Sequence, residues 1–170
     1  LKGLAYAERG FRNLTNSERP VNTPEDMKGL RIRVMENPVY VDTFRALGAN
    51  AIPMAWTEAL TAMQQNTIDG QENPANVIHS FKLYETQDYM TLSRHTYAPA
   101  IFVMGMPVWN KLPEAAQAVV LQAAQEAAEH ERQVNAKMES QQLAELREAG
   151  MQINDTPDIK AFQAAVVPVY

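Results

Sequence analysis

The spacing of apolar residues changes several times along the chain, and each change predicts a new element. In LRIRVM, residues 30–35, apolar residues alternate with Arg31 and Arg33, which is typical of a half-buried strand with both arginines on one face. Other apolar runs predict further strands. These lie in residues 1–10 (ending near Gly10), 49–54, 89–93, 95–109 and 151–155.

Helical spacing follows most of these strands, and capping residues mark the expected helix ends. Asn37 and Pro38 predict an N-cap and a first helical residue, with Gly48 as the stop. The tripeptide Glu-Asn-Pro returns at residues 72–74, where Asn73 is interpreted as a second N-cap. The remaining predicted helical segments are a short turn from Thr23, residues 56–65 capped by Thr57, residues 113–149 and residues 158–166.

Strands that alternate with helices predict the α/β fold class with a largely parallel sheet. In such sheets, ligands bind beyond the carboxyl ends of the strands, where helix N-termini meet. Both Glu-Asn-Pro copies are expected at corners of this kind. The pattern in residues 113–149 predicts one helix about 55 Å long at ~1.5 Å per residue, longer than a single small lobe needs.

Composition narrows the function classes. The 170 residues carry a net charge of −5, which argues against non-specific nucleic-acid binding, and there is no cysteine for a disulfide, a thiolate metal site or a nucleophile. The three histidines are dispersed without metal-ligand spacing. No phosphate-binding or dinucleotide-binding motif occurs, so the sequence predicts neither a metal nor a cofactor.

Arg33 is the strongest candidate for ligand binding. It is expected at the end of a strand just before a helix N-terminus, and its planar guanidinium suits a carboxylate. A surface ion pair with an acidic residue is the alternative, and Arg12 has the same two interpretations. Trp56 could wall a pocket or belong to the core. Glu36 and Glu72 could act as an acid–base pair, although nothing in the sequence sets their separation.

Three segments resemble the solute-binding proteins of tripartite ATP-independent periplasmic (TRAP) transporters, the DctP-like family. They are GFRNLTNSERPVNTPEDMKGLRIRVMENP, FRALGANAIPMAWTEALTAMQQNTIDGQENP and VWNKLPEAAQAVV. The resemblance implies an α/β fold like that of type II periplasmic binding proteins, with one α/β lobe plus a long helix that normally spans two lobes. It also implies a non-enzymatic, periplasmic protein that captures a small organic acid and delivers it to the TRAP membrane permease.

The resemblance assigns roles residue by residue. Arg33 matches the arginine that pairs with the ligand carboxylate, Arg12 a second basic residue, Trp56 an aromatic pocket wall and Asn73 a ligand-contacting asparagine. Glu36 and Asn37 are placed next to the pocket. Leu60 departs from the family pattern, since many relatives have Tyr there. The polar set with Trp56 favours a hydroxylated sugar acid, such as a uronate, over a C4-dicarboxylate.

The resemblance also implies that this chain is the C-terminal part of a longer protein. Residues 1–98 are expected to form the second lobe, and residues 99–170 a crossing strand, the long helix and a C-terminal segment, with most of the first lobe absent. The long helix would then expose an apolar stripe that favours self-association. Its members are Val119, Val120, Ala123, Ala127 and Val134.

Two other functions compete with transport. One is an enzyme that uses Glu36 or Glu72 as a base with Arg33 as the substrate anchor. The other is a cytosolic ligand-sensing module fused to a DNA-binding domain.

Overall fold

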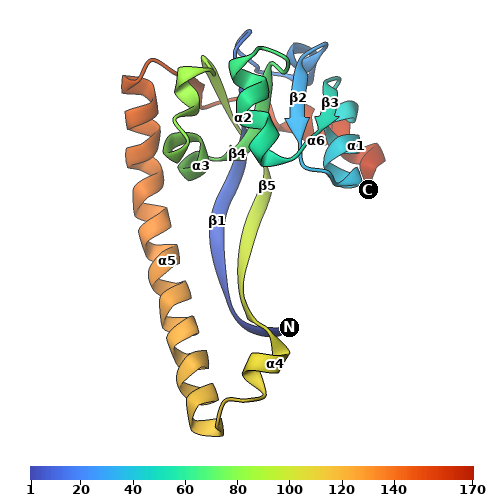
Figure 1. The fold of residues 1–170 in the computed structure, drawn as a ribbon. Coiled ribbons are helices and arrows are strands. Elements are labelled where there is room, and N and C mark those ends of the chain that lie inside the picture. The colour runs from blue at the N-terminus through green and yellow to red at the C-terminus, as the bar shows by residue number, and fades with distance from the viewer.

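The computed structural model describes residues 1–170 and shows one α/β lobe with two long extensions. Strands β1 (Lys2–Asn16) and β5 (Tyr89–Met104) leave the lobe side by side, and helix α5 (Glu114–Glu148) runs along them (Figure 1). The short helix α4 (Met106–Trp109) closes the far end, near the N-terminus. The predicted α/β class and the long helix are confirmed.

Six strands form one mixed sheet in the order β3-β2-β4-β1-β5-β6. Pairing is parallel for β2 with β3, β2 with β4, and β5 with β6, whereas β1 pairs antiparallel with both β4 and β5. The expectation of a largely parallel sheet was therefore wrong for its centre. The four remaining strands are β2 (Arg31–Val34), β3 (Asn50–Pro53), β4 (Gly70–Pro74) and β6 (Gln152–Asn154).

Strand β1 does not end near Gly10, as the sequence predicted. Gly10 adopts a φ of 89° and lies at a register shift between β1 and β5, so a β-bulge absorbs the glycine and pairing continues to Asn16. The two apolar runs in residues 89–109 likewise form one strand, β5, up to Met104. Arg12 consequently lies inside β1 and not at its end.

The helices begin and end largely where the capping residues predicted. Asn37 caps α1 (Pro38–Ala46) by accepting a 2.9 Å hydrogen bond from the Val39 backbone N–H, and Gly48 follows with a φ of 89°. Thr57 is not a cap, because α2 (Trp56–Gln64) already begins one residue earlier, after Ala55. The other helical segments are η1 (Pro24–Met27), α3 (Ala75–Ser80), η2 (Leu83–Glu85), α6 (Ile159–Val166) and η3 (Val167–Val169).

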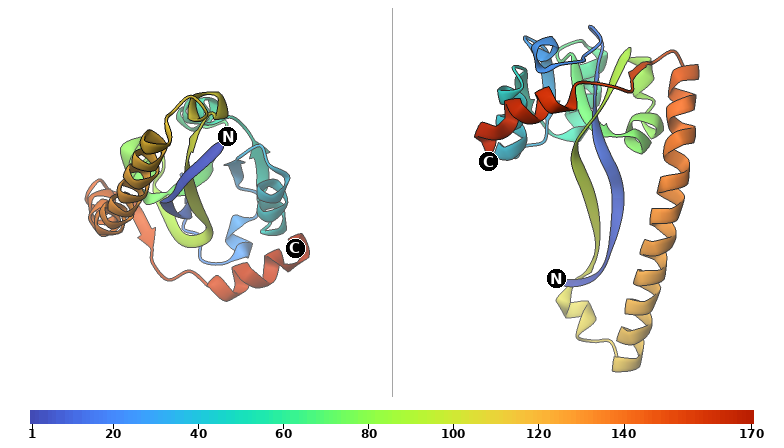
Figure 2. Two further views of the ribbon diagram at one scale, coloured as in Figure 1. Left: turned by 90° about the horizontal axis from the view of Figure 1, so that it is seen from below. Right: turned by 180° about the vertical axis from the view of Figure 1, so that it is seen from behind.

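Helices cover the two faces of the sheet (Figure 2), and an apolar cluster lies on each face. On one face, α2, α3 and the C-terminal end of α5 pack through residues that include Met63, Ile78 and Leu146. On the other, α1 and α6 pack through Phe44 and Phe162. The lobe therefore has a core on both sides of its sheet. Each fully buried side chain of this size contributes about 1.5–3 kcal/mol to folding stability.

The extension has little covering away from the lobe. Val119 and Val134 of the α5 stripe are 66% and 38% exposed, which agrees with an uncovered apolar face. The predicted division at residue 98 falls inside β5, which continues to Met104, and it stays a prediction. No helix in the structure has both the length and the apolar character that crossing a membrane requires.

Candidate ligand-binding site

The candidate residues gather where three parallel strands end. Strands β2, β3 and β4 run in the same direction, so Arg33 near the end of β2, Trp56 just after β3 and Asn73 near the end of β4 approach one edge of the sheet. Arg12 of β1 is brought to the same edge, since it lies opposite Pro74 in the antiparallel pair. The sequence placed Arg33 correctly at a strand end.

Arg33 is a buried cation without a carboxylate partner. It is 4% exposed, so the half-buried face expected for β2 was wrong at this position: helix α2 and its preceding turn cover it. Its Nε donates a 2.8 Å hydrogen bond to the Met54 carbonyl, and its guanidinium carbon lies 5.6 Å from the centre of the Trp56 ring. Neither terminal nitrogen donates to a protein group, and no ion pair involves Arg33.

The electrostatics of Arg33 follow from this burial. Loss of water, the largest influence, lowers the pKa of Arg33 below its ordinary value, and the nearby Arg12 cation lowers it further, while Glu72 and Glu36 oppose the change. Arginine still stays charged at neutral pH. A desolvated, unpaired cation is unfavourable by itself, so an anion placed against it would gain the attraction that the protein leaves unused.

Arg12 is committed to a partner within the protein. Its Nε and Nη2 both donate to the Glu72 carboxylate, the latter at 2.8 Å, and Nη2 also donates to the Glu72 carbonyl at 2.7 Å. His95 Nε2 lies 3.1 Å from the same carboxylate, and its Nδ1 lies 2.9 Å from the Ser93 hydroxyl. The Arg12 guanidinium also faces Tyr40 at 5.8 Å.

This cluster keeps Glu72 ionised. Burial opposes ionisation of the fully buried Glu72 side chain, but hydrogen bonds from His95 and Arg12 outweigh it and hold the pKa of Glu72 below its ordinary value. A carboxylate that is already bonded to two cationic or polar partners is a poor general base. The two carboxylates proposed as an acid–base pair also differ in setting, because Glu36 is exposed.

Asn73 is a strand residue, which corrects its interpretation as an N-cap. Helix α3 begins at Ala75 after Pro74, with no side-chain cap. Asn73 instead donates from Nδ2 to Gln71 Oε1 at 2.6 Å, Gln71 donates to Thr15 at 2.9 Å, and Thr15 donates to Gln87 at 2.9 Å. This buried series of hydrogen bonds fixes the Asn73 amide and leaves its Oδ1 and one N–H without a protein partner.

The other two candidates lie at the rim. Asn37 and Glu36 are exposed, and the side-chain oxygen of Asn37 already accepts the hydrogen bond that caps α1. Glu36 is near enough to influence Arg33 electrostatically but makes no ion pair with it. The ligand-binding roles of all six candidates remain predictions.

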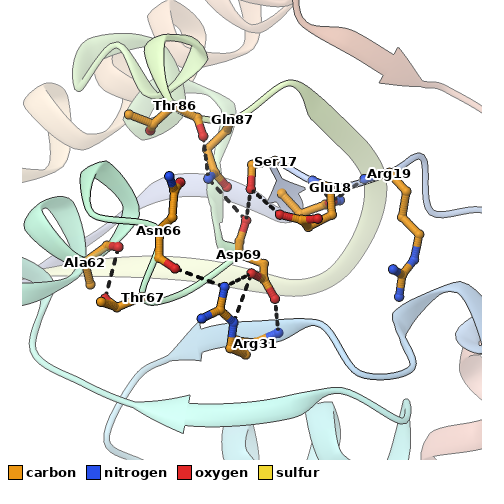
Figure 3. A network of polar contacts seen from close by, with 11 residues as sticks. Ser17, Glu18, Arg19, Arg31, Ala62, Asn66, Thr67, Asp69, Thr86 and Gln87 are labelled. Carbon is orange, nitrogen blue, oxygen red and sulfur yellow. Dashed lines mark hydrogen bonds and ion pairs between the residues drawn. The ribbon is translucent and has the colours of Figure 1, made fainter.

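The opposite end of β2 has a closed network (Figure 3). The Arg31 side chain donates to Asp69 Oδ1 from Nε at 3.0 Å and also from Nη2, and its backbone N–H donates to Oδ2 at 2.7 Å. Burial opposes ionisation of Asp69, but the bonds from Arg31 prevail and lower its pKa. Arg31 thus has the ion pair that was the alternative interpretation for Arg33.

Sequence reasoning missed the partners of Arg12. Glu72 was noticed only as a possible base, and His95 was set aside because the histidines are dispersed. A β-bulge brings His95 into place: Leu14 pairs with Thr91 and Arg12 with Thr96, so β5 accommodates extra residues between them. No signal in the sequence predicts that register.

None of the five best-defined cavities is lined by the six candidate residues. One of about 740 Å³ lies between the kink of β5 at Arg94 and the C-terminal end of α5, and its lining includes Arg147 and Asp155. No group of three or more histidine, aspartate or glutamate side chains is positioned to hold a metal ion.

Comparison with known proteins identifies the family. The sequence profile of the bacterial extracellular solute-binding proteins, family 7, matches residues 1–170. A solute-binding protein of Verminephrobacter eiseniae is 44% identical over 168 residues, which cover 99% of this chain and 50% of that protein.

Two solved structures share the fold. A TRAP periplasmic solute-binding protein of Polaromonas sp. JS666, bound to D-erythronate, superposes with a TM-score of 0.95 at 42% identity and covers 99% of this chain and 55% of that one. One from Roseobacter denitrificans, bound to β-D-glucuronate, gives 0.94 at 34% identity with 99% and 56% covered. The chain therefore spans about half the length of the relatives it matches.

Proposed function

The chain belongs to family 7 of the bacterial extracellular solute-binding proteins, and we propose that it forms one wall of a cleft that captures a small organic acid. Arg33 pairs with the ligand carboxylate in this proposal, and Trp56 and Asn73 line the same wall. The protein that carries the chain then delivers the acid from the periplasm to the membrane permease of a TRAP transporter.

The state of Arg33 carries the proposal. It is buried, it has no carboxylate partner, and its terminal nitrogens are free, while the neighbouring Arg12 is fully occupied by Glu72. A planar guanidinium presents parallel N–H donors that match the two oxygens of a carboxylate. The site therefore offers one uncompensated positive charge to one acidic group.

The same count of charges favours a hydroxylated monocarboxylate over a dicarboxylate. A second ligand carboxylate would meet no second free guanidinium among the candidates, since Glu72 neutralises Arg12. The free Oδ1 and N–H of Asn73 suit a hydroxyl group, which both donates and accepts hydrogen bonds. The relatives bound to D-erythronate and β-D-glucuronate support a ligand of this class.

Closure of a cleft supplies the affinity. Before closure, the ligand carboxylate faces water on the side away from Arg33, and a pair screened in this way is too weak for micromolar capture. When a second wall excludes water, the lower effective dielectric strengthens the same pair several-fold. We infer that residues of the longer protein provide this wall, and that this chain alone binds the acid weakly.

The chemistry of the carboxylates argues against the enzymatic alternative. A general base needs a free lone pair near the substrate and a pKa close to the working pH. Glu72 has neither, because its oxygens accept from Arg12 and His95 and its pKa is lowered. Capture without chemistry is the function that the geometry supports best.

Isothermal titration calorimetry of the complete gene product tests the proposal. The panel contains D-erythronate, D-glucuronate and succinate, and we expect the hydroxylated acids to bind more tightly than succinate. Arg33→Ala should weaken binding at least about 30-fold, from the loss of about 2 kcal/mol or more that truncating one partner of a buried charge pair causes. Arg31→Ala is the matched control, expected to leave affinity within about twofold. Tight binding that survives Arg33→Ala contradicts the assignment.

A further inference from the structure

Phe81 is a half-exposed aromatic residue that the site described above does not use. It is 49% exposed and follows the last turn of α3. Its ring contacts Trp56, with ring centres 5.3 Å apart and planes at 86°, which is the edge-to-face arrangement favoured by aromatic pairs. Trp56 in turn lies against the guanidinium of Arg33 at 5.6 Å. Arg33 of β2, Trp56 of α2 and Phe81 just after α3 thus form one continuous row of contacts.

The backbone fixes the outer member of this row. The Phe81 N–H donates to the Val77 carbonyl at 3.0 Å, and Lys82 follows in the left-handed conformation with a φ of 51°, which ends the helix sharply. Helix α3 is anchored from within by Ile78, which is fully buried, and from the side by a 2.6 Å contact between His79 and Glu145 of α5. Phe81 therefore projects from a rigid support although its ring is half exposed.

The inner member is held from two sides. The turn between β3 and α2 supplies both the Met54 carbonyl, which binds Arg33 Nε, and the Trp56 ring, which covers the guanidinium. Trp56 also packs against the apolar cluster that α2, α3 and the C-terminal end of α5 share. Phe81 adds an edge-to-face contact with the indole, and this contact limits rotation of the ring away from Arg33.

We propose that Phe81 is a positioning residue for acid capture: its ring locks Trp56 over Arg33 before the ligand arrives. This inference rests on the proposed function of Arg33 and names a residue outside the six candidates. The indole in this position shields one side of the carboxylate–guanidinium pair from water. Because the side chain is already ordered, its loss of rotational freedom does not weaken binding. Phe81 makes no contact with the ligand in this proposal and influences binding only through Trp56.

An exposed edge-to-face pair elsewhere on the molecule provides a useful contrast. Phe11 and Tyr97 also meet edge to face at 5.3 Å, and both are similarly exposed, yet neither ring is stacked on a guanidinium. An edge-to-face pair on this surface is therefore not in itself a sign of function. The contact with a buried, unpaired cation distinguishes the Phe81–Trp56 pair.

Tryptophan fluorescence makes the positioning role measurable. The chain has two tryptophans, Trp56 and Trp109, and Trp109 lies in α4 at the far end of the extension. In a Trp109→Phe version of the complete gene product, Trp56 is the only tryptophan contributed by this chain, and difference spectra against a Trp56→Phe version isolate its signal. We expect Phe81→Ala to shift Trp56 emission to longer wavelength, lower its anisotropy and weaken binding of D-erythronate or D-glucuronate about 3- to 10-fold.

Two further variants separate positioning from bulk. Phe81→Tyr keeps the aromatic edge and should retain both the emission and the affinity of the parent, whereas Phe81→Leu keeps apolar contact without the ring geometry and should fall between Tyr and Ala. Unchanged affinity in Phe81→Ala overturns the inference, whether or not the emission moves. So does weakened binding with Trp56 emission and anisotropy unchanged, since Phe81 would then act by another route.

The Arg33→Ala variant distinguishes failure of this inference from failure of the proposed function. If Arg33→Ala loses binding and Phe81→Ala does not, only the positioning role is wrong. If the parent protein binds none of the acids, the proposed function and the positioning role fall together.

Discussion

Strand β2 carries an arginine near each end, and the two ends have opposite surroundings. At the first residue, Arg31 shares three hydrogen bonds with the Asp69 carboxylate and one with the Asn66 carbonyl (Figure 3). Two residues later, Arg33 is more deeply buried but has one hydrogen bond to a carbonyl and no counter-charge. The same residue type on the same face of one strand therefore forms an internal ion pair at one end and has no protein counter-charge at the other.

The difference shows that burial and pairing must be considered together. A partly exposed arginine with a carboxylate is an internal contact, whereas a buried arginine without one is an incomplete interaction that an anion completes. We call the Arg31 end of β2 the closed end and the Arg33 end the open end. Substitutions at the closed end should change folding stability and leave acid binding unchanged. Those at the open end should do the reverse.

The largest effect is expected from Gly70→Ala, at the closed end. A Cβ on Gly70 would lie 2.1 Å from the Thr15 carbonyl oxygen and 2.9 Å from Asn16 Cβ, so β4 would have to move away from β1. We expect a loss of about 3 kcal/mol or more in the free energy of unfolding, measured by urea denaturation of the purified chain. Gly3→Ala is the control, since its Cβ would meet nothing within 4 Å. Equal stability of the two variants contradicts the close approach of β4 and β1.

Next in size is Asp69→Ala, which removes the acceptor of the Arg31 backbone N–H and Nε and leaves Nη2 with the Asn66 carbonyl alone. We expect a loss of about 2 kcal/mol in unfolding free energy, with acid affinity unchanged within about twofold. Asp155→Ala breaks the exposed pair with Arg147 and should cost less than about 1 kcal/mol. A larger effect from Asp155 than from Asp69 would reverse the expected order.

Arg33→Lys separates the charge of Arg33 from the geometry of its guanidinium at the open end. Lysine keeps the charge but loses the planar fork and the Nε–H that binds the Met54 carbonyl. We expect acid affinity in the complete gene product to fall about 10-fold by calorimetry, with little change in stability. Arg31→Lys serves as the partner variant, and its affinity should match the parent. Parent-like binding by Arg33→Lys would show that charge alone suffices.

Acid pH should give the smallest effect, and its sign follows from the lowered carboxylate pKa values. The pKa of Asp69 lies below its unfolded value of 3.8 and that of Glu72 below 4.5, so the unfolded chain binds more protons in acid. The stability they contribute is complete well above pH 4.5 and is lost as pH falls through their folded values. Urea midpoints between pH 7 and pH 3 should decline, and Asp69→Asn should flatten the decline. A midpoint independent of pH contradicts both shifts.

The local elements followed from the sequence because their causes are local. Asn37 caps α1 through its own side chain, Gly48 ends it with a positive φ, and the pattern before Gly150 predicts α5 almost to the residue. The position of Arg33 at a strand end was also accessible, since alternation and the following cap fix both neighbours. The family resemblance added the fold and the class of function.

Other features depend on which strands pair, and the sequence does not state that. Asn73 looked like a second Asn37, but β1 pairs with β4 through residue 74 and holds the second Glu-Asn-Pro in a strand. The same antiparallel pairing, together with the bulge in β5, brings both Arg12 and His95 to Glu72. Arg12 is 60 positions from Glu72 along the chain, and His95 is 23 positions from it.

The elements, their caps and the charge types that reach one edge of the sheet could all be predicted, because they depend on near neighbours along the chain. Which arginine is paired and which is unpaired became visible only in the folded protein. That outcome depends on long-range register: Asp69 meets Arg31, Glu72 meets Arg12, and no acidic residue forms an ion pair with Arg33. A carboxylate pairs with the cation that folding brings within hydrogen-bond distance, and sequence separation carries no information about that distance.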